Sequence, residues 1–138
     1  MKTVGTDGRT YILNPSKDSR ECEDENRSAL HLKAREILKK NFPHSATYEE
    51  VTLAGCKGIG GAPLTADFYI PDLGIIIEVH GAQHYKYNKH FFKTEAEFNR
   101  AQRNDEIKKE WAELNELVFI ELPYDEVKNW GKIINDTI

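Results

Sequence analysis

The 138-residue sequence predicts an α/β (α+β) fold with one central mixed β-sheet flanked by helices. Segments with strand patterning and amphipathic helices follow one another in the order β, α, β, β, β, α, β, α. That order favours helices packed against a single sheet. Hydrophobic residues make up 39% of the chain and charged residues 30%, and these ordinary globular proportions argue against a disordered or fibrous protein.

The first 27 residues are expected to form an N-terminal hairpin followed by an acidic linker. In residues 1–14, the sequence Thr6-Asp7-Gly8-Arg9 has turn chemistry and lies between two short apolar segments, as in a β-hairpin. Residues 18–25 contain five acids and one base, so this stretch accounts for the whole net charge of −4. The main folded domain is then expected over residues 28–138.

Within that domain the elements follow from periodicity and end signals. A helix is expected from Ser28, a suitable N-cap, to Phe42, because its apolar residues recur with helical spacing and Pro43 stops it. Strands are expected at residues 47–53, 64–70, 74–80 and 118–122. A glycine-rich loop is expected at 54–63, and further helices at 93–115 and 125–134.

Composition also indicates the cellular compartment in which the protein is expected. Cys22 and Cys56 form no CxxC pair, which disfavours a disulfide scaffold or a cysteine zinc site. No apolar run approaches the roughly 20 residues that cross a bilayer. The N-terminus has no apolar region of the kind found in a secretion signal. We therefore expect a cytoplasmic protein, in a host cell if it is encoded by a phage, with no membrane partner.

Basic residues gather between positions 86 and 109, where seven bases stand against four acids. A local basic stripe can bind phosphates even when the total charge is negative. The alternative is a solvated helix face. The candidates for contact with a DNA backbone are Lys86, Lys89, Lys93, Arg100 and Arg103.

The hairpin that turns at Asp72 and Leu73 places two acids opposite each other. In an even-length turn the numbers of paired residues sum to 145, so Asp67 faces Glu78, and alternation puts His80 on the same polar face. Directly opposed like charges destabilise a sheet. A shared proton, a lysine or a divalent cation such as Mg²⁺ would offset the repulsion. An exposed sheet face that tolerates acids is the alternative.

Two further groups have the chemistry of a hydrolytic site. His80 and His84 end the strand, and a histidine near a metal-bound water can relay a proton at neutral pH. On the long helix, Asp105 shares a stripe with Lys108 and could face these histidines. An ordinary surface acid is the competing interpretation of Asp105.

Together, three segments resemble the PD-(D/E)XK nuclease superfamily, and more narrowly the branch of the very-short-patch repair endonuclease and the EDxHD phage homing endonucleases. The segments are Leu64–Pro71, Ile77–Tyr85, and Asp105 with Lys108 and Lys109. The resemblance covers roughly residues 28–130. It implies a restriction-endonuclease-like core and Mg²⁺-dependent hydrolysis of DNA, with Mn²⁺ as a substitute. It also suggests a phage or mobile-element origin.

The resemblance also implies roles for single residues. Asp67 matches the metal-binding aspartate, and Glu78 matches the acid of the (D/E)XK element, with the Val79 carbonyl as a further metal ligand. His80 takes the place of the usual lysine. His84 matches the branch's second histidine, a general acid or base, and Asp105 matches the final aspartate.

One position departs from the family pattern. The acid expected on the first helix aligns with His31, and Glu49 or Glu50 on the next strand are the candidates to replace it. The sequence thus predicts a metal-dependent DNA endonuclease, and a homodimer would allow it to cut two strands. The alternative is a nuclease-like domain that has lost catalysis and binds nucleic acid or protein.

Overall fold

A computed structural model describes residues 1–20, 28–81, 87 and 92–138. Its strands are β1 (Lys2–Val4), β2 (Thr10–Ile12), β3 (Tyr48–Lys57), β4 (Pro63–Ile70), β5 (Ile75–His80) and β6 (Val118–Pro123). Its α-helices are α1 (Pro15–Asp18), α2 (Ala29–Asn41), α3 (Glu95–Leu114) and α4 (Trp130–Thr137). Short 3-10 helices span Pro71–Leu73 and Val127–Asn129.

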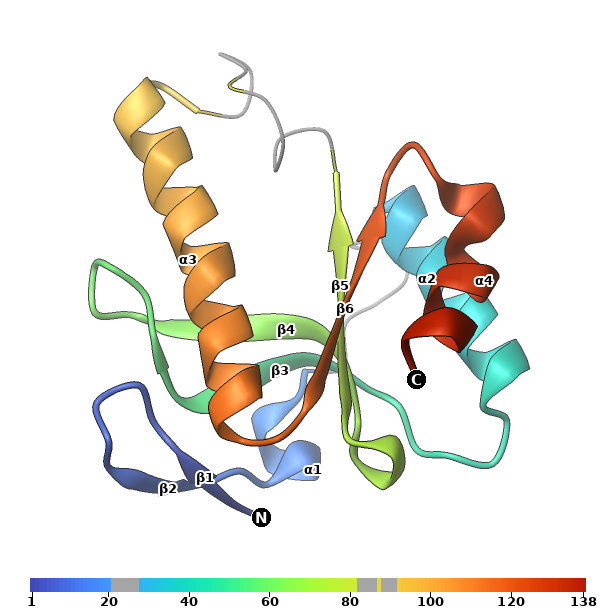
Figure 1. Cartoon of the computed structure of the whole chain (residues 1–138), viewed down its shortest axis with the longest axis horizontal. Helices are drawn as coiled ribbons and strands as arrows, with labels where there is room; N and C mark the ends of the chain where they lie inside the picture. The colour runs from blue at the N-terminus through green and yellow to red at the C-terminus, as the bar shows by residue number, and fades with distance from the viewer. Residues whose placement is uncertain (21–27, 82–86, 88–91) are drawn as a thin grey trace.

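The central sheet has four strands in the order β3-β4-β5-β6. The pairs β3–β4 and β4–β5 are antiparallel, whereas β5 and β6 are parallel, so the sheet is mixed as predicted. A parallel pair needs a crossover connection, and α3 lies in that connection. Figure 1 shows α3 on one side of the sheet and α2 with α4 on the other.

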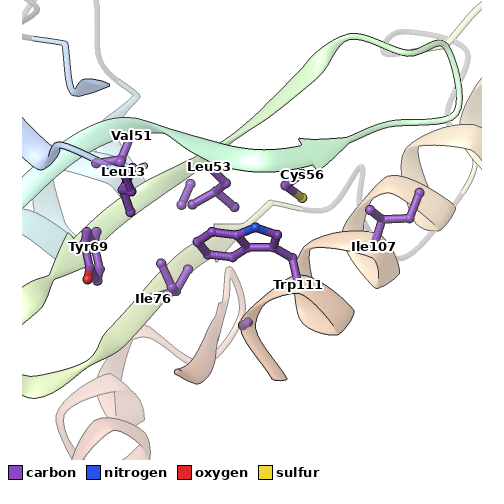
Figure 2. Packing of buried hydrophobic residues seen from close by; sticks show 10 residues of the cluster. Leu13, Val51, Leu53, Cys56, Tyr69, Ile76, Ile107 and Trp111 are labelled. Atoms are coloured by element: carbon purple, nitrogen blue, oxygen red, sulfur yellow. The ribbon is translucent and has the colours of Figure 1, made fainter. Parts of the chain in front are cut away.

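The two faces of the sheet bury separate apolar clusters. Towards α2 and α4 the cluster contains Ala34, Leu38, Phe68, Ile70, Ile75, Ile77, Ile120, Leu122, Trp130 and Ile134. Phe68, Ile70, Ile75 and Ile77 share this face, as the alternation of side chains along the two strands requires. Towards α3, the Trp111 ring lies among Leu53, Cys56 and Ile76 (Figure 2). Its Nε1–H donates to the Ala54 carbonyl at 2.9 Å.

The first long helix begins as the sequence predicts. The Ser28 side chain caps it by accepting a hydrogen bond from the His31 amide at 3.1 Å. The helix ends at Asn41, with Phe42 as its C-cap, just before Pro43. His31, Ala34 and Leu38 are its buried residues, so this face packs on the sheet and carries His31 inwards.

The N-terminal hairpin shares a core with the sheet. Leu13 is fully buried in the cluster under α3. The Thr3 hydroxyl donates to the Ala54 carbonyl at 3.0 Å. The Asn115 side chain accepts from the Val4 amide at 2.7 Å and donates to the Val4 carbonyl at 3.0 Å, as a neighbouring strand would. The hairpin is therefore fixed both to β3 and to the end of α3.

Close approach of backbone to an aromatic ring explains one glycine in β3. Gly55 has a φ of +85°, and a Cβ there would lie 2.5 Å from Tyr11 Cδ2. Only glycine accepts both the left-handed backbone and this contact. The Gly55 carbonyl also accepts from the Thr6 amide at 3.1 Å. Tyr11 of β2 can therefore lie against β3.

Several predicted boundaries of secondary-structure elements were wrong. The glycine-rich loop is shorter than expected, because β3 continues to Lys57 and β4 already begins at Pro63. The short helix α1 stands in the predicted linker, where the Asn14 side chain caps it. The closing helix begins at Trp130 rather than at Asp125, after the 3-10 helix over Val127–Asn129. Among the described residues, no helix combines the length and apolar character that crossing a membrane requires.

Candidate functional site

The register of the β4–β5 hairpin follows the predicted sum. Phe68 pairs with Ile77 and Ile70 with Ile75, and the next step of the same register sets Asp67 opposite Glu78. After burial, the nearby charge of Asp67 is the next cause that raises the pKa of Glu78, so the two carboxyl groups lie close together. The expectation that Asp67 and Glu78 are cross-strand neighbours is therefore confirmed.

A lysine from α3 offsets the electrostatic repulsion between Asp67 and Glu78. Lys108 Nζ lies 2.7 Å from Glu78 Oε1, and Glu78 is only 3% exposed. Burial is the main reason that the pKa of Glu78 lies well above its usual range. The charge of Asp67 raises it further, and Lys108 opposes the shift. Burial, the largest single cause, would lower the pKa of Lys108, but the charge and hydrogen bond of Glu78 together with the charges of Asp105 and Asp67 outweigh it and raise that pKa.

Asp67 is held in place by the backbone of the neighbouring strand. Its Oδ2 accepts a hydrogen bond from the Val79 amide at 2.8 Å. An acid fixed in this way needs little reorganisation to serve as a ligand. The sequence expected the Val79 carbonyl to act as a metal ligand, and the contact that the structure shows is made by the amide of the same residue.

His31, Glu50 and Asp67 come together from three different elements. One possible ligand atom from each lies within 4.8 Å of those of the other two. His31 comes from α2, Glu50 from β3 and Asp67 from β4. The sequence offered His31, Glu49 and Glu50 as candidates for the missing helix acid. In the structure, His31 and Glu50 are the two that group with Asp67.

Glu49 contacts the imidazole ring of His31. His31 Nε2 is 2.6 Å from Glu49 Oε1. Arg35 holds the same carboxylate with two hydrogen bonds, from Nε to Oε2 at 3.0 Å and from an Nη to Oε1 at 3.1 Å. Burial raises the pKa of Glu49, but the hydrogen bonds from Arg35 and His31 outweigh it, and the pKa is lowered overall. Glu49 is thus a charged anchor for the imidazole.

An unusual backbone conformation at Glu50 lets two adjacent acids reach the same histidine. Side chains of successive strand residues normally point to opposite faces. Glu50 has a φ of +50°, in the left-handed region that costs a non-glycine residue on the order of 1–3 kcal/mol. Glu49 pairs with Phe68 and Val51 with Ala66, so Glu50 stands opposite Asp67 in the ladder. Such conformations gather at functional sites.

His80 lies beyond Glu78 on β5 and contacts the parallel strand. Its Nδ1 is 3.4 Å from Glu121 Oε2, and the ring is buried. Lys109 of α3 also pairs with Glu121. The hydrogen bond from His80, with help from Lys109, lowers the pKa of Glu121 to about 2. His80 is thereby oriented by Glu121, a partner that sequence reasoning did not name.

The remaining predicted residues fall into two groups. Asp105 is half-buried on α3, and its charge adds to the causes that raise the pKa of Lys108, three residues further along the helix. That Asp105 orients a histidine stays a prediction. Arg103 is exposed and pairs with Glu106 at 2.9 Å and with Glu110 at 3.0 Å. Lys93 and Arg100 are exposed near the start of α3. The predicted residues His84, Lys86 and Lys89 lie outside the described part of the chain.

Sequence reasoning gave no role to Lys108, Arg35 or Glu121. A signal existed for two of them. Lys108 follows Asp105 by three positions and Arg35 follows His31 by four, and residues at those spacings share a helix face. Glu121 could be placed only through the parallel pairing of β5 with β6, in which it stands beside Glu78.

Comparison with known proteins finds viral relatives without a stated activity. Uncharacterized protein 307L of Invertebrate iridescent virus 6 is 40% identical over 65 residues, which cover 47% of this chain and 33% of the relative. Uncharacterized protein 033L of Invertebrate iridescent virus 3 is 35% identical over 66 residues, covering 48% and 34%. The chain thus spans about a third of the length of these relatives. No family model matches the sequence, and no solved structure matches it significantly.

Proposed function

We propose that the protein is a metal-dependent DNA endonuclease with a restriction-endonuclease-like core. The observation that carries this proposal is the Asp67–Glu78 pair on adjacent antiparallel strands, with the Lys108 ammonium 2.7 Å from Glu78. A carboxylate that can hold a cation, next to a buried positive charge, suits the hydrolysis of a phosphodiester. The sequence resemblance to PD-(D/E)XK nucleases supports the same reading.

The residues of the site would divide the work as follows. Asp67, held by the Val79 amide, is the carboxylate best placed to ligate a cation. Lys108 would bring a positive charge to the negative charge that develops on the phosphate. A divalent cation, Mg²⁺ on the family pattern, would supply an activated water and neutralise phosphate charge when bound.

Proton transfer and contact with the phosphate are assigned to the two histidines at positions 84 and 80 of the sequence. His84 would exchange a proton with the attacking water or the leaving oxygen, with Asp105 orienting it. His80 would contact the phosphate from a position that Glu121 fixes. Val79 lies between Glu78 and His80 and would bring its carbonyl to the same cation.

Affinity for DNA would come from the basic residues between positions 86 and 103. Lys93 and Arg100 are exposed there and available to phosphates. Lys86 and Lys89 would extend the same stripe. Arg103 is paired with Glu106 and Glu110, so we expect the smallest share from it. Contacts to phosphates position DNA without reading its sequence. A homodimer would let two such sites cut both strands.

A second candidate is a nuclease-like module that binds nucleic acid or protein without cutting it. The specific observation in its favour is that Glu78 is 3% exposed and already engaged by Lys108. A buried acid with a raised pKa is a weaker cation ligand than an exposed carboxylate. The same surface would then retain DNA binding while the chemistry is lost.

Nicking of supercoiled plasmid separates the two candidates. The wild-type protein should nick plasmid with Mg²⁺ or Mn²⁺ and stop in chelator. Asp67→Asn should abolish nicking while the thermal melting of the protein is retained. Asp72→Asn, in the exposed turn of the same hairpin, is the matched control and should cut normally. DNA binding without nicking under any of these ions would favour the module.

A further inference from the structure

His31 is the residue that sets this site apart from an all-oxygen cation site. It is buried in α2, and its ring stacks on Phe68 with the centroids 4.4 Å apart and the planes 22° from parallel. The stack fixes the plane of the imidazole. The same ring belongs to the His31–Glu50–Asp67 group, whose ligand atoms lie within 4.8 Å of one another.

We propose that His31, Glu50 and Asp67 form a site for a first-row transition-metal dication such as Mn²⁺, in preference to Mg²⁺. The inference rests on the proposed function, because it names the ion for the same centre. One imidazole nitrogen and two carboxylate oxygens form a mixed ligand set. Mg²⁺ takes oxygen ligands and keeps its waters. Imidazole suits transition ions, and carboxylate suits Mn²⁺.

Spacing is compatible with one shared ion. Ligand atoms bound at about 2.1 Å to a common ion lie at most about 4.2 Å apart. The three groups are within 4.8 Å, so movements of some tenths of an ångström in the side chains would bring them into coordination. Glu50 is half-buried and has side-chain torsions to make that adjustment.

The contacts behind His31 have the form that metal-binding histidines require. A ligating imidazole generally donates its other ring N–H to a carboxylate, which fixes the tautomer and raises the basicity of the ligating nitrogen. His31 meets Glu49 through Nε2 at 2.6 Å. A ring that donates an N–H to Glu49 keeps the lone pair of its other nitrogen for a cation. Arg35 holds Glu49 by two hydrogen bonds and prevents it from turning towards the ion itself.

Glu78 does not compete for the role of third ligand. Its Oε1 lies 2.7 Å from Lys108, and the residue is almost completely buried. Because Lys108 already engages Glu78, Asp67 is the acid of the β4–β5 hairpin that belongs to the His31–Glu50–Asp67 group. On this reading Glu50 supplies the carboxylate that the first helix lacks.

Direct metal binding tests the proposal without any nuclease assay. The full chain is titrated with Co²⁺, followed by its visible absorption, and with Mn²⁺, followed by electron paramagnetic resonance. Mg²⁺ is added as a competitor to each. We expect Co²⁺ to bind more tightly than Mn²⁺, and Mn²⁺ more tightly than Mg²⁺, as imidazole-containing sites generally do. Mg²⁺ that displaces either ion at comparable concentration would overturn the proposal.

Single substitutions test which residues are the metal ligands. His31→Glu should weaken Co²⁺ binding by about 10–100-fold or more. It should also reduce the difference in affinity between Mn²⁺ and Mg²⁺. Glu49→Gln should weaken Co²⁺ binding by about 10–100-fold, the usual effect of losing such a support. His44→Glu, at an exposed position after α2, makes the same substitution outside the site and should change nothing. Unchanged Co²⁺ affinity in His31→Glu would also overturn the proposal.

Because His31 is buried, its replacement costs stability, and Glu50→Gln provides an isosteric second test. Compared with its own melting temperature without metal, this variant should lose the stabilisation that Co²⁺ gives the wild type. The two proposals fail in different ways. Co²⁺ binding that depends on His31, with no nicking under any ion, would reject the nuclease alone. Nicking by His31→Glu with the wild-type preference for ions would reject the histidine site alone.

Discussion

Lys108 and Glu78 form a nearly buried ion pair, with 2.7 Å between Nζ and Oε1, that joins α3 to the central strand β5. Their side chains are 14% and 4% exposed, respectively. The neighbouring lysine on the helix, Lys109, makes the opposite kind of pair, because its side chain is 49% exposed. Lys108 and Lys109 are adjacent on α3, and one forms a buried ion pair while the other forms an exposed one.

Lys108→Met should lower the free energy of unfolding by about 3–5 kcal/mol, because it leaves Glu78 buried without its cation. Lys109→Met is the matched control and should cost about 0–1 kcal/mol, as exposed pairs do. Urea denaturation measures both. Adding Glu78→Gln to Lys108→Met should restore part of the loss, since the buried charge is then removed as well. Equal losses in the two lysine variants would refute the distinction.

Glu121 should make the stability of the protein depend on pH in the acid range. Its pKa is lowered to about 2 in the fold, against about 4.3 in an unfolded chain. Because the folded pKa is the lower one, the stabilisation is complete above about pH 5 and is lost as the pH falls towards 2. The shift alone corresponds to about 3 kcal/mol. We expect on the order of 1–2 kcal/mol, because the partly exposed side chain is screened by solvent.

The measurement compares the wild type with Glu121→Gln by urea denaturation from pH 7 down to pH 3. The difference in the free energy of unfolding should be largest at neutral pH and should shrink on acidification. Glu113→Gln, at an exposed position on α3, should show no such trend. A difference that grows as the pH falls would contradict the assignment.

Gly55→Ala should loosen the N-terminal hairpin. A Cβ at this position would lie 2.5 Å from the Tyr11 ring on a backbone with a φ of +85°. Overpacking costs about 1–3 kcal/mol, and the left-handed backbone adds about 1–2 kcal/mol. Gly60→Ala is the control, because no atom outside its own neighbours lies within 4 Å of the added carbon. Thermal melting should separate the two variants clearly, and a normal Gly55→Ala would show that the hairpin does not depend on this contact.

Replacing Lys86, Lys89 and Lys93 together with alanine should weaken DNA binding for all sequences alike. The slope of log affinity against log salt is negative, and each phosphate contact that is lost reduces its magnitude by about 0.9. We therefore expect the magnitude of the slope to fall by about 2–3. The control removes the exposed residues Lys33, Lys39 and Lys40 from α2, which changes the net charge by the same amount. An unchanged slope in the first variant would place the DNA elsewhere on the surface.

The part of the site that lies within one hairpin was predictable from the sequence. Side chains on a strand alternate with a period of two, so the turn at Asp72 fixed both the Asp67–Glu78 pairing and the apolar face that carries Phe68. The capping of α2 by Ser28 followed from equally local chemistry. These features depend on neighbours in the chain.

The contacts that complete the site were not predictable in the same way. Lys108 and His31 reach the acids only because two helices pack on opposite faces of the sheet, and the rotation of each helix is decided by its whole buried face. The left-handed backbone of Glu50 has no signal in the sequence, since glutamate does not favour it. The docking of Leu13 and Asn115 likewise joins segments far apart in the chain.

The mixed topology of the sheet has a consequence for the order in which the protein folds. The strands β3, β4 and β5 are consecutive and antiparallel, so short loops bring Asp67 and Glu78 together early. The strand β6 pairs in parallel with β5, Ile75 beside Val118, only after the chain has passed through α3. Pairings of such long range are slow to form. We therefore expect the two acids to meet before Lys108 arrives, so that a late step of folding is the one that balances their charge.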